Sequence, residues 1–193
     1  PAFRPDRAMN VEKPDFADYI AKLSEASGVE ITDIVSLCDA LERRIEFFDA
    51  LGCRTADHGF DDYVAFDETK SAAQSISIAD VTLKRALAGE KIDSEMAKIY
   101  KGALIRFFGR EYVKHGWVMQ LHFGAMRSPN TVMKNLLGPD TGYDAIHGTN
   151  CIYALARMLD TLNSENALPR TILYSLNPTD NAALAVLAGS FQY

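Results

Sequence analysis

Gly116-Trp-Val-Met-Gln-Leu-His-Phe-Gly-Ala-Met-Arg127 is the stretch of this sequence that decides the fold. Five apolar or amide residues in a row, Trp117 to Leu121, lie between two glycines and predict a strand that is covered on both faces. His122 is the last residue of that strand, and a glycine turn leads from it to Arg127. Ligands bind at the carboxyl ends of strands in parallel α/β sheets, so this polar end is a candidate site.

The rest of the chain repeats the order of a strand followed by one or more helices. Ala2-Phe3-Arg4 is predicted to end a strand, and further strands are predicted at 53–59 and 171–176. Apolar residues at helical spacing fill the intervals. Residues 190–193 are predicted to begin another strand. Alternation of this kind indicates a parallel sheet with right-handed crossovers.

The predicted fold class is therefore α/β, a parallel-stranded partial (β/α)8 barrel of the TIM type with extra helices. Four βα units and the start of a fifth strand make about half of such a barrel, which typically needs roughly 250 residues. We expect residues 1–193 to be the central part of a single barrel domain, with a helical insertion at about 70–115. The chain begins without methionine and stops where a strand opens, so we expect a piece of a longer protein.

Local signals predict helix starts and loops. Thr32 is expected to cap one helix, and Ser77 and Asp80 have capping-box spacing at the start of another. An acidic loop is predicted from Phe60 to about Thr69, and a longer one, rich in turn formers, from Ser128 to Asn150. Loops of that length in a compact domain are usually functional.

Composition narrows the classes of function. The net charge of -6 argues against nucleic acid, whose phosphates require a basic face. The sequence has no run of 18 apolar residues and no signal pattern, so we expect neither a membrane protein nor a secreted one. Its three cysteines are odd in number and widely spaced, which favours reduced thiols in the cytoplasm. It contains no complete metal motif and no dinucleotide-binding motif.

Polar residues follow four of the predicted strands and should meet at one mouth of the barrel. Arginine matches a carboxylate by paired hydrogen bonds, and histidine moves protons near neutral pH or binds a metal. Together they predict a site for an anionic, oxygen-rich ligand. The residues are Arg4, Asp57 with His58, His122 with Arg127, and Asn177 with Asp180.

Each of these residues also has a structural interpretation. A histidine at a strand end is often a structural hydrogen-bonding residue, and Arg4 could form only a turn-stabilising ion pair with Asp6. Asp180 is better explained as a helix cap than as a catalyst. His115 and His147 are given no role. A polar pair follows each of the two best-defined strands, and this recurrence favours a collective site.

At these residues the chain resembles the uronate isomerase family, also called glucuronate isomerase. The resemblance implies a metal-binding (β/α)8 barrel of the amidohydrolase superfamily. It also implies reversible aldose–ketose isomerisation of hexuronates, D-glucuronate to D-fructuronate and D-galacturonate to D-tagaturonate. The matching segments run in order along nearly the whole chain: Phe3-Arg-Pro-Asp6, Asp57-His-Gly59, residues 116–127, Leu137-Gly-Pro-Asp-Thr-Gly-Tyr-Asp144 and Leu168-Pro-Arg-Thr-Ile-Leu-Tyr-Ser-Leu-Asn177.

The same resemblance implies roles for the site residues. A proton moves between C2 and C1 through an enediol, and a divalent metal such as zinc polarises the oxygens. Its ligands, a His-x-His and an Asp, lie on strands outside this chain. Arg4 matches the arginine expected to hold the sugar carboxylate, and His58 and His122 match histidines at the barrel mouth, with acid and base unassigned between them. From their place at the strand ends, Arg127 is predicted to bind substrate as well, and Asp57 joins the two histidines as a candidate catalytic residue.

Two alternatives remain open. One is a metal-dependent hydrolase or lactonase of the same superfamily, which would use the same mouth for a carboxylated ring. The other is a non-catalytic piece that acts only as an assembly module. A partial parallel sheet has unpaired edges, so either the remainder of the barrel or a second copy is the expected partner.

Overall fold

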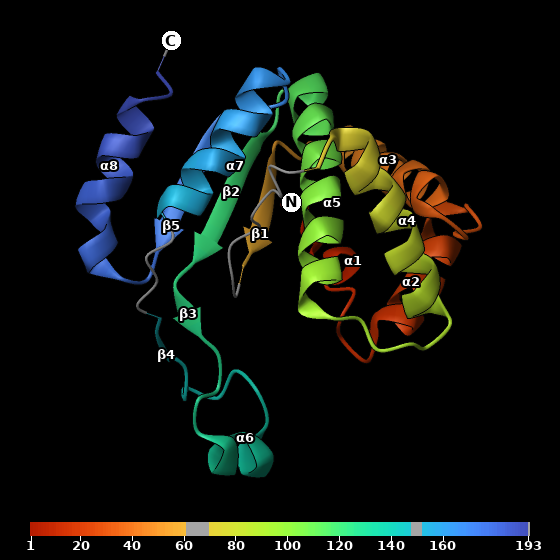
Figure 1. Ribbon diagram of the computed structural model, residues 1–193, viewed down its shortest axis with the longest axis horizontal. Helices are drawn as coiled ribbons and strands as arrows, with labels where there is room; N and C mark the ends of the chain where they lie inside the picture. The colour runs from red at the N-terminus through yellow and green to blue at the C-terminus, as the bar shows by residue number, and fades with distance from the viewer. Residues whose placement is uncertain (61–69, 148–151, 193) are drawn as a thin grey trace.

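The computed structural model describes residues 1–60, 70–147 and 152–192, which form a small parallel sheet flanked by helices (Figure 1). Strands β1 (Thr55–Gly59), β2 (Val118–Phe123) and β5 (Thr171–Ser175) lie in the order β1-β2-β5, and both pairings are parallel. Phe3 adds a single parallel bridge to Ala56. The predicted α/β class with a parallel sheet is therefore confirmed.

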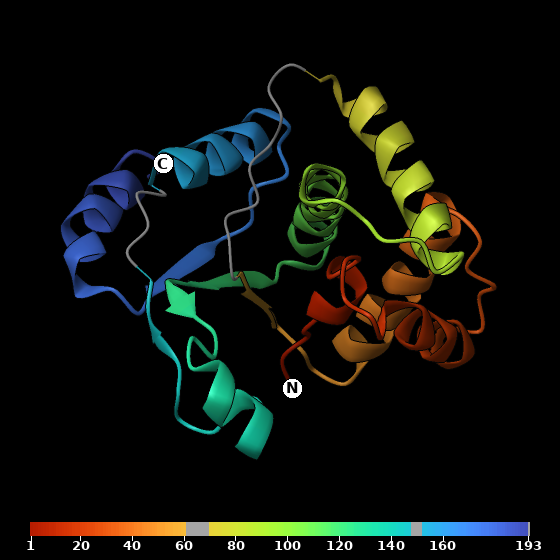
Figure 2. The ribbon, with the colours of Figure 1, turned by 60° about the horizontal axis from the view of Figure 1, so that its bottom comes forward.

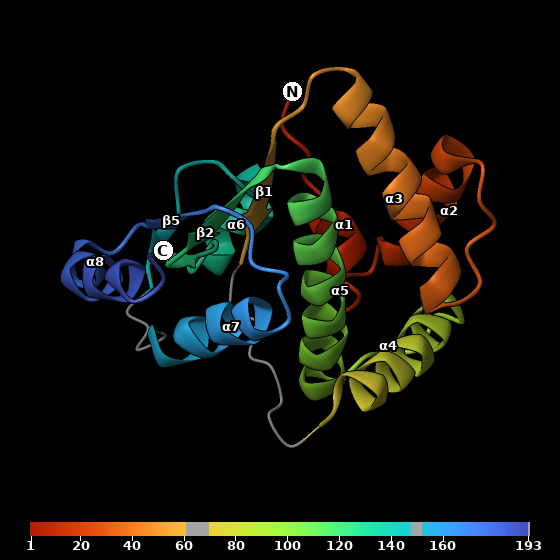
Figure 3. The same cartoon turned by 90° about the horizontal axis from the view of Figure 1, so that it is seen from above.

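Helices surround the sheet unevenly. Figures 1 and 3 show α5 and α7 on one face of the sheet, with α2, α3 and α4 gathered beyond α5. Figure 2 shows α8 at the outer edge, beyond β5. No helix in the described ranges is long and apolar enough to span a membrane. The helices are α1 (Asp6–Met9), α2 (Phe16–Ser27), α3 (Ile34–Ala50), α4 (Ala72–Leu87), α5 (Ser94–His115), α7 (Ile152–Ser164) and α8 (Asn181–Gly189), the last preceded by a 3-10 turn at Pro178–Asp180.

Helix α5 fixes the position of the central strand. It ends at Gly116, whose φ of 66° reverses the chain so that Trp117 leads directly into β2. The Trp117 indole is buried against the ring of Tyr112, and its Nε1 donates to Oδ1 of Asp49 at 2.7 Å. The ring of Phe3 packs edge-on to this indole, which ties the N-terminal segment to the same core.

The two faces of the sheet differ. Met119, Leu121 and Phe123 of β2 are buried toward the helices. The alternate residues, Gln120 and His122, lie on a face that is partly open. The prediction that this strand is covered on both faces is therefore wrong for the described residues. Side chains alternate along a strand, and only one set meets the helices.

Three local predictions differ from the structure. Helix α4 starts earlier than predicted because Ser71, not Ser77, is its N-cap. Asp80 lies inside that helix and accepts from the backbone N–H of Ile34. Asp33, not Thr32, caps α3. Residues 190–191 form a turn rather than the start of a strand, and residue 193 lies outside the described residues. The predicted acidic loop falls mostly at 61–69, and this range and residues 148–151 also lie outside the described residues.

The segment predicted as a long loop is partly ordered. Strands β3 (Ala125–Met126) and β4 (Ala145–Ile146) pair antiparallel, and α6 (Thr131–Leu137) lies between them. We call residues 125–147 the arm. Figure 1 shows the arm extending away from the sheet, beyond the carboxyl end of β2.

Candidate functional site

A cavity of about 760 Å³ opens at the carboxyl ends of β1 and β2. Four of the seven residues predicted to meet at the barrel mouth line it: Arg4, Asp57, His122 and Arg127. They come from the Phe3 bridge, β1, β2 and the base of the arm, so the strand ends converge as parallel geometry requires.

Arg4 is held at the cavity by two carboxylates. Its Nε donates to Oδ2 of Asp6 at 3.0 Å and lies 3.5 Å from Oδ2 of Asp57. The same Asp6 oxygen accepts from the backbone N–H of Gly59 at 3.0 Å. Burial raises the pKa of Asp6, while the Gly59 amide and Arg4 oppose that shift. The predicted Arg4–Asp6 turn pair exists, and it also fixes the guanidinium at the cavity.

Asp57 and His122 form the closest acid–imidazole contact of the site. Oδ1 of Asp57 lies 2.7 Å from Nε2 of His122. One face of the His122 imidazole stacks on the Tyr174 ring, with the ring centroids 4.4 Å apart and an angle of 11° between the planes. The Tyr174 hydroxyl donates to Oε1 of Gln120 at 3.0 Å. An acidic group at its edge and an aromatic ring on its face therefore orient His122.

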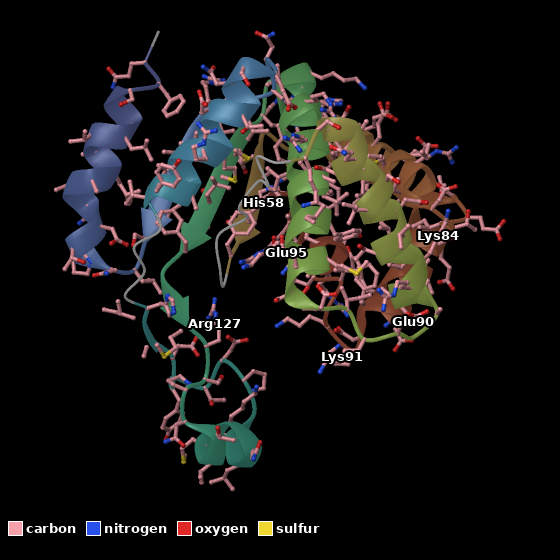
Figure 4. All side chains as sticks on the ribbon, in the orientation of Figure 1. His58, Lys84, Glu90, Lys91, Glu95 and Arg127 are labelled. Carbon is pink, nitrogen blue, oxygen red and sulfur yellow. The ribbon has the colours of Figure 1, made fainter. Side chains whose placement is uncertain are left out.

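His58 lies on the opposite face of the sheet from Asp57 and does not line the cavity. Its fully buried ring stacks on Phe60, and its Nε2 lies 3.0 Å from the Tyr112 hydroxyl. Figure 4 shows it between β1 and α5. Burial, and next the nearby Arg4 charge, lower the pKa of His58 from 6.5 to about 3. This histidine is therefore neutral near pH 7.

Arg127 lies at the base of the arm, well separated from His58 in Figure 4. Its Nη1 donates to Oδ2 of Asp144 at 2.6 Å and lies 3.5 Å from Oδ1 of Asp140. Asn177 and Asp180, which also followed a predicted strand, do not line this cavity. Asn177 caps the 3-10 turn, as Asx residues commonly do. Asp180 accepts from the hydroxyl of Ser175 at 2.8 Å.

The arrangement suits proton transfer on an anionic substrate. We assign the proton of the neutral His122 ring to Nε2, because an unprotonated Nε2 would repel the ionised Asp57 carboxylate at 2.7 Å. That assignment leaves Nδ1 as the basic nitrogen of the ring. Arg4 and Arg127 border the same cavity and supply charge for a carboxylate.

The described residues do not form a metal site. No group of three or more His, Cys, Asp or Glu side chains in ranges 1–60, 70–147 and 152–192 could hold a metal ion. Oδ2 of Asp6 accepts from Arg4 and from the Gly59 amide, whereas Oδ1 of Asp6 and Oδ1 of Asp57 are buried without a hydrogen-bond partner among the described residues. The described side chains of the cavity therefore do not by themselves supply a ligand set for the divalent metal that the resemblance implies.

Comparison with known proteins decides the family. The family model described as "Glucuronate isomerase" matches residues 1–193. The chain belongs to the glucuronate isomerase family. It is 48% identical over 193 residues to the uronate isomerase of Caldicellulosiruptor bescii and 45% identical over 192 residues to that of Salmonella arizonae. All of this chain is matched in both cases, but only 40% of each relative, so the chain spans well under half of their length.

Solved structures of this family have the same fold. The uronate isomerase of Thermotoga maritima matches 99% of this chain with a TM-score of 0.85 and 30% identity. The glucuronate isomerase of Caulobacter crescentus matches 97% with a TM-score of 0.80 and 27% identity. This chain covers 41% and 38% of those two chains, respectively. The likeness supports the predicted partial barrel.

Sequence reasoning missed two residues of this candidate site. In the sequence Asp6 is only a possible turn partner of Arg4, although the Phe3-Arg-Pro-Asp6 segment contains it. Tyr174 is only part of a predicted strand. Its place beside His122 follows from the register, which pairs His122 with Tyr174 across β2 and β5. The available signal was alternation: Tyr174 and Ile172 share the open face.

Proposed function

We propose that the protein carrying this chain catalyses the reversible aldose–ketose isomerisation of hexuronates. The substrates would be D-glucuronate, converted to D-fructuronate, and D-galacturonate, converted to D-tagaturonate. The observation that supports this most is the 2.7 Å contact of Asp57 and His122 in a cavity that Arg4 and Arg127 also line. Membership of the glucuronate isomerase family supports the same reaction.

His122 is the proposed proton carrier. Nδ1 takes the proton from C2 of the open-chain aldose, the C2–H bonding pair becomes the C1–C2 double bond of an enediol, and the C1=O pair moves to O1, which takes a proton from solvent. The imidazolium then gives a proton to C1 while O2 releases its own proton to solvent and becomes the C2 carbonyl of the ketose. Asp57 stabilises the imidazolium formed in between, because its carboxylate lies against Nε2.

Arg4 and Arg127 are the proposed binding groups for the substrate carboxylate. Both guanidinium groups lie at the cavity, and paired N–H donors match the two oxygens of a carboxylate. For His58 we propose a supporting role in place of the expected catalytic one. The buried ring packs under β1 next to Tyr112, and its Nδ1 lies 3.7 Å from Oδ1 of Asp6.

A divalent metal, with zinc as the candidate, would be held by residues other than those described here. No step above is routed through it. We further propose that residues 1–193 are the central part of one barrel domain, with residues 70–115 as its helical insertion. The unpaired sheet edge would then meet the remainder of the barrel or a second copy.

A cytoplasmic location is part of the same proposal. Cys38 and Cys53 are free thiols, which suits a reducing compartment. Burial raises the pKa of Cys38 to about 12, so this thiol stays protonated and unreactive.

The function is tested by incubating the natural protein that contains this chain with each hexuronate and following ketose formation by NMR. We expect ketose from glucuronate or galacturonate, with no water added. Hydrolysis of uronolactones without conversion of the free hexuronates would instead support the superfamily hydrolase. If the folded protein converts neither hexuronates nor uronolactones, the remaining alternative is a non-catalytic piece that acts as an assembly module.

A further inference from the structure

The segment Leu137-Gly-Pro-Asp-Thr-Gly-Tyr-Asp144 has no role in the proposed proton transfer, although it is among the segments that resemble the family. It forms the return leg of the arm, between α6 and β4. Its last residue, Asp144, lies where the two legs come together beside the pairing of β3 with β4. The segment therefore ends next to Arg127, at the cavity.

One carboxylate in this segment binds two consecutive residues of the other leg. Oδ2 of Asp144 accepts from Nη1 of Arg127 at 2.6 Å. Oδ1 of Asp144 accepts from the backbone N–H of Ser128 at 2.8 Å. The two bonds hold both the guanidinium and the backbone that carries it.

The backbone at Ser128 needs such support. Its φ is 45°, in the left-handed region that residues with a Cβ seldom adopt. Strained positions of this kind persist when surrounding contacts fix them, and they gather at functional sites. The backbone bond from Ser128, and next the bond from Arg127, lower the pKa of Asp144, so this carboxylate is ionised near neutral pH.

We propose that Asp144 is a positioning residue, which holds Arg127 at the mouth of the cavity in the orientation that receives a substrate carboxylate. The proposal rests on the proposed function, and it adds a residue to which no role in that function was given. Asp140 offers an internal contrast. It lies 3.5 Å from the same Nη1 with its side chain 79% exposed, whereas the Asp144 side chain is 28% exposed. Ion pairs between exposed side chains contribute little free energy, so Asp140 should hold Arg127 only weakly.

A double-mutant cycle in the natural protein tests this role. Asp144→Asn keeps the shape and an acceptor for Ser128 but removes the charge that binds Arg127. We expect kcat/KM for the hexuronate to fall on the order of 10- to 100-fold, mainly through KM, because small displacements of a binding group have effects of this size. The matched Asp140→Asn variant should stay within about threefold of wild type.

The second arm of the cycle uses Arg127→Met. In that background Asp144→Asn should add less than about threefold, because the two residues act as one unit. If Asp144→Asn lowers kcat/KM by the same factor in wild type and in Arg127→Met, Asp144 only supports the fold, and the proposal is overturned. An equal loss from Asp140→Asn would overturn it too.

A readout that does not depend on turnover separates this proposal from the proposed function. The Nε–H resonance of Arg127 in 15N NMR should show a restrained side chain in wild type and Asp140→Asn, and a mobile one in Asp144→Asn. An equally restrained Arg127 in Asp144→Asn rejects the positioning role. If wild type is restrained as expected but converts no hexuronate, the proposed function fails and the positioning role stands.

Discussion

Asp57 and His122 lie two positions out of register on neighbouring strands, yet their side chains meet at 2.7 Å. The residue directly opposite His122 is Gly59, and the residue opposite Asp57 is Gln120. Because glycine has no side chain, the imidazole can lean diagonally toward Asp57. The second oxygen of Asp57 lies 3.5 Å from Arg4, so one carboxylate links the proposed proton carrier to a proposed substrate-binding residue.

Asp57→Asn should slow the chemical step. The amide cannot stabilise an imidazolium as a carboxylate does, so we expect kcat to fall about 100-fold, within the range for general acid–base catalysis. KM should change much less. Steady-state kinetics on the natural protein measure both. The control is Asp15→Asn, which removes an exposed partner of Arg7 and should leave kcat unchanged. A kcat within a few-fold of wild type for Asp57→Asn would show that the pair is not catalytic.

Arg4→Met should weaken substrate binding and transition-state stabilisation together. Removing one partner of a close charge pair costs about 2–4 kcal/mol, which is on the order of 30- to 700-fold in kcat/KM. Arg54→Met is the matched control because Arg54 pairs with Asp49, and neither residue lines the cavity. An unchanged KM and kcat for Arg4→Met would remove Arg4 from the site.

Gly59→Ala should disturb the same arginine without changing any charge. A Cβ at this position would lie 2.9 Å from Nη2 of Arg4 and 3.4 Å from Oδ2 of Asp6. Because the nearest atom ends a flexible side chain, Arg4 should move while the fold persists. We expect kcat/KM to fall about 10-fold, with the melting temperature lowered by only a few degrees. Gly189→Ala is the control, since a Cβ there meets nothing within 4 Å.

The buried imidazole of His58 should make the fold sensitive to acid. Its pKa is lowered to about 3 in the folded chain, against 6.5 ordinarily, so below pH 6.5 the unfolded chain binds a proton that the folded chain excludes. The contribution of neutral His58 to the free energy of unfolding is complete above pH 6.5. As the pH falls from 6.5 toward 3, this contribution decreases by about 1.4 kcal/mol per pH unit.

Denaturant unfolding of wild type and His58→Gln between pH 7 and pH 4 checks this. Titrating carboxylates affect both proteins alike, so the difference between the two curves isolates His58. We expect the difference in the free energy of unfolding between wild type and His58→Gln to shrink as the pH falls. Parallel curves over that range would show that His58 titrates normally.

The sequence predicted which strand ends would meet, and for a physical reason. In a parallel sheet all carboxyl ends face one edge, so the sequence alone places Arg4, Asp57, His122 and Arg127 in one group. The direction in which each side chain points could not be predicted in this way. Asp57 and His58 are adjacent and must point to opposite faces, and only the packing of Tyr112 and Phe108 decides that His58 is the buried one.

The arm shows a second limit of sequence reasoning. Turn-forming residues between Ser128 and Asn150 predicted a loop, but Asn130 caps the short helix α6, and β3 pairs with β4. Two-residue strands carry no periodicity that a sequence pattern could show. The role proposed for Asp144 depends on contacts across 16 and 17 residues of chain, which only the structure provides.

The central claim is that His122, oriented by Asp57, carries the proton between C2 and C1. The most direct test compares wild type with His122→Gln, each incubated with D-glucuronate in deuterium oxide, and follows deuterium at C1 of the ketose by NMR. The His122 side chain is 46% exposed, so the proton that it takes from C2 exchanges with solvent before it is delivered to C1. The account therefore predicts deuterium at C1 in wild type and a rate of incorporation at least about 100-fold lower in the folded variant. Equal rates of incorporation in the two proteins would contradict it.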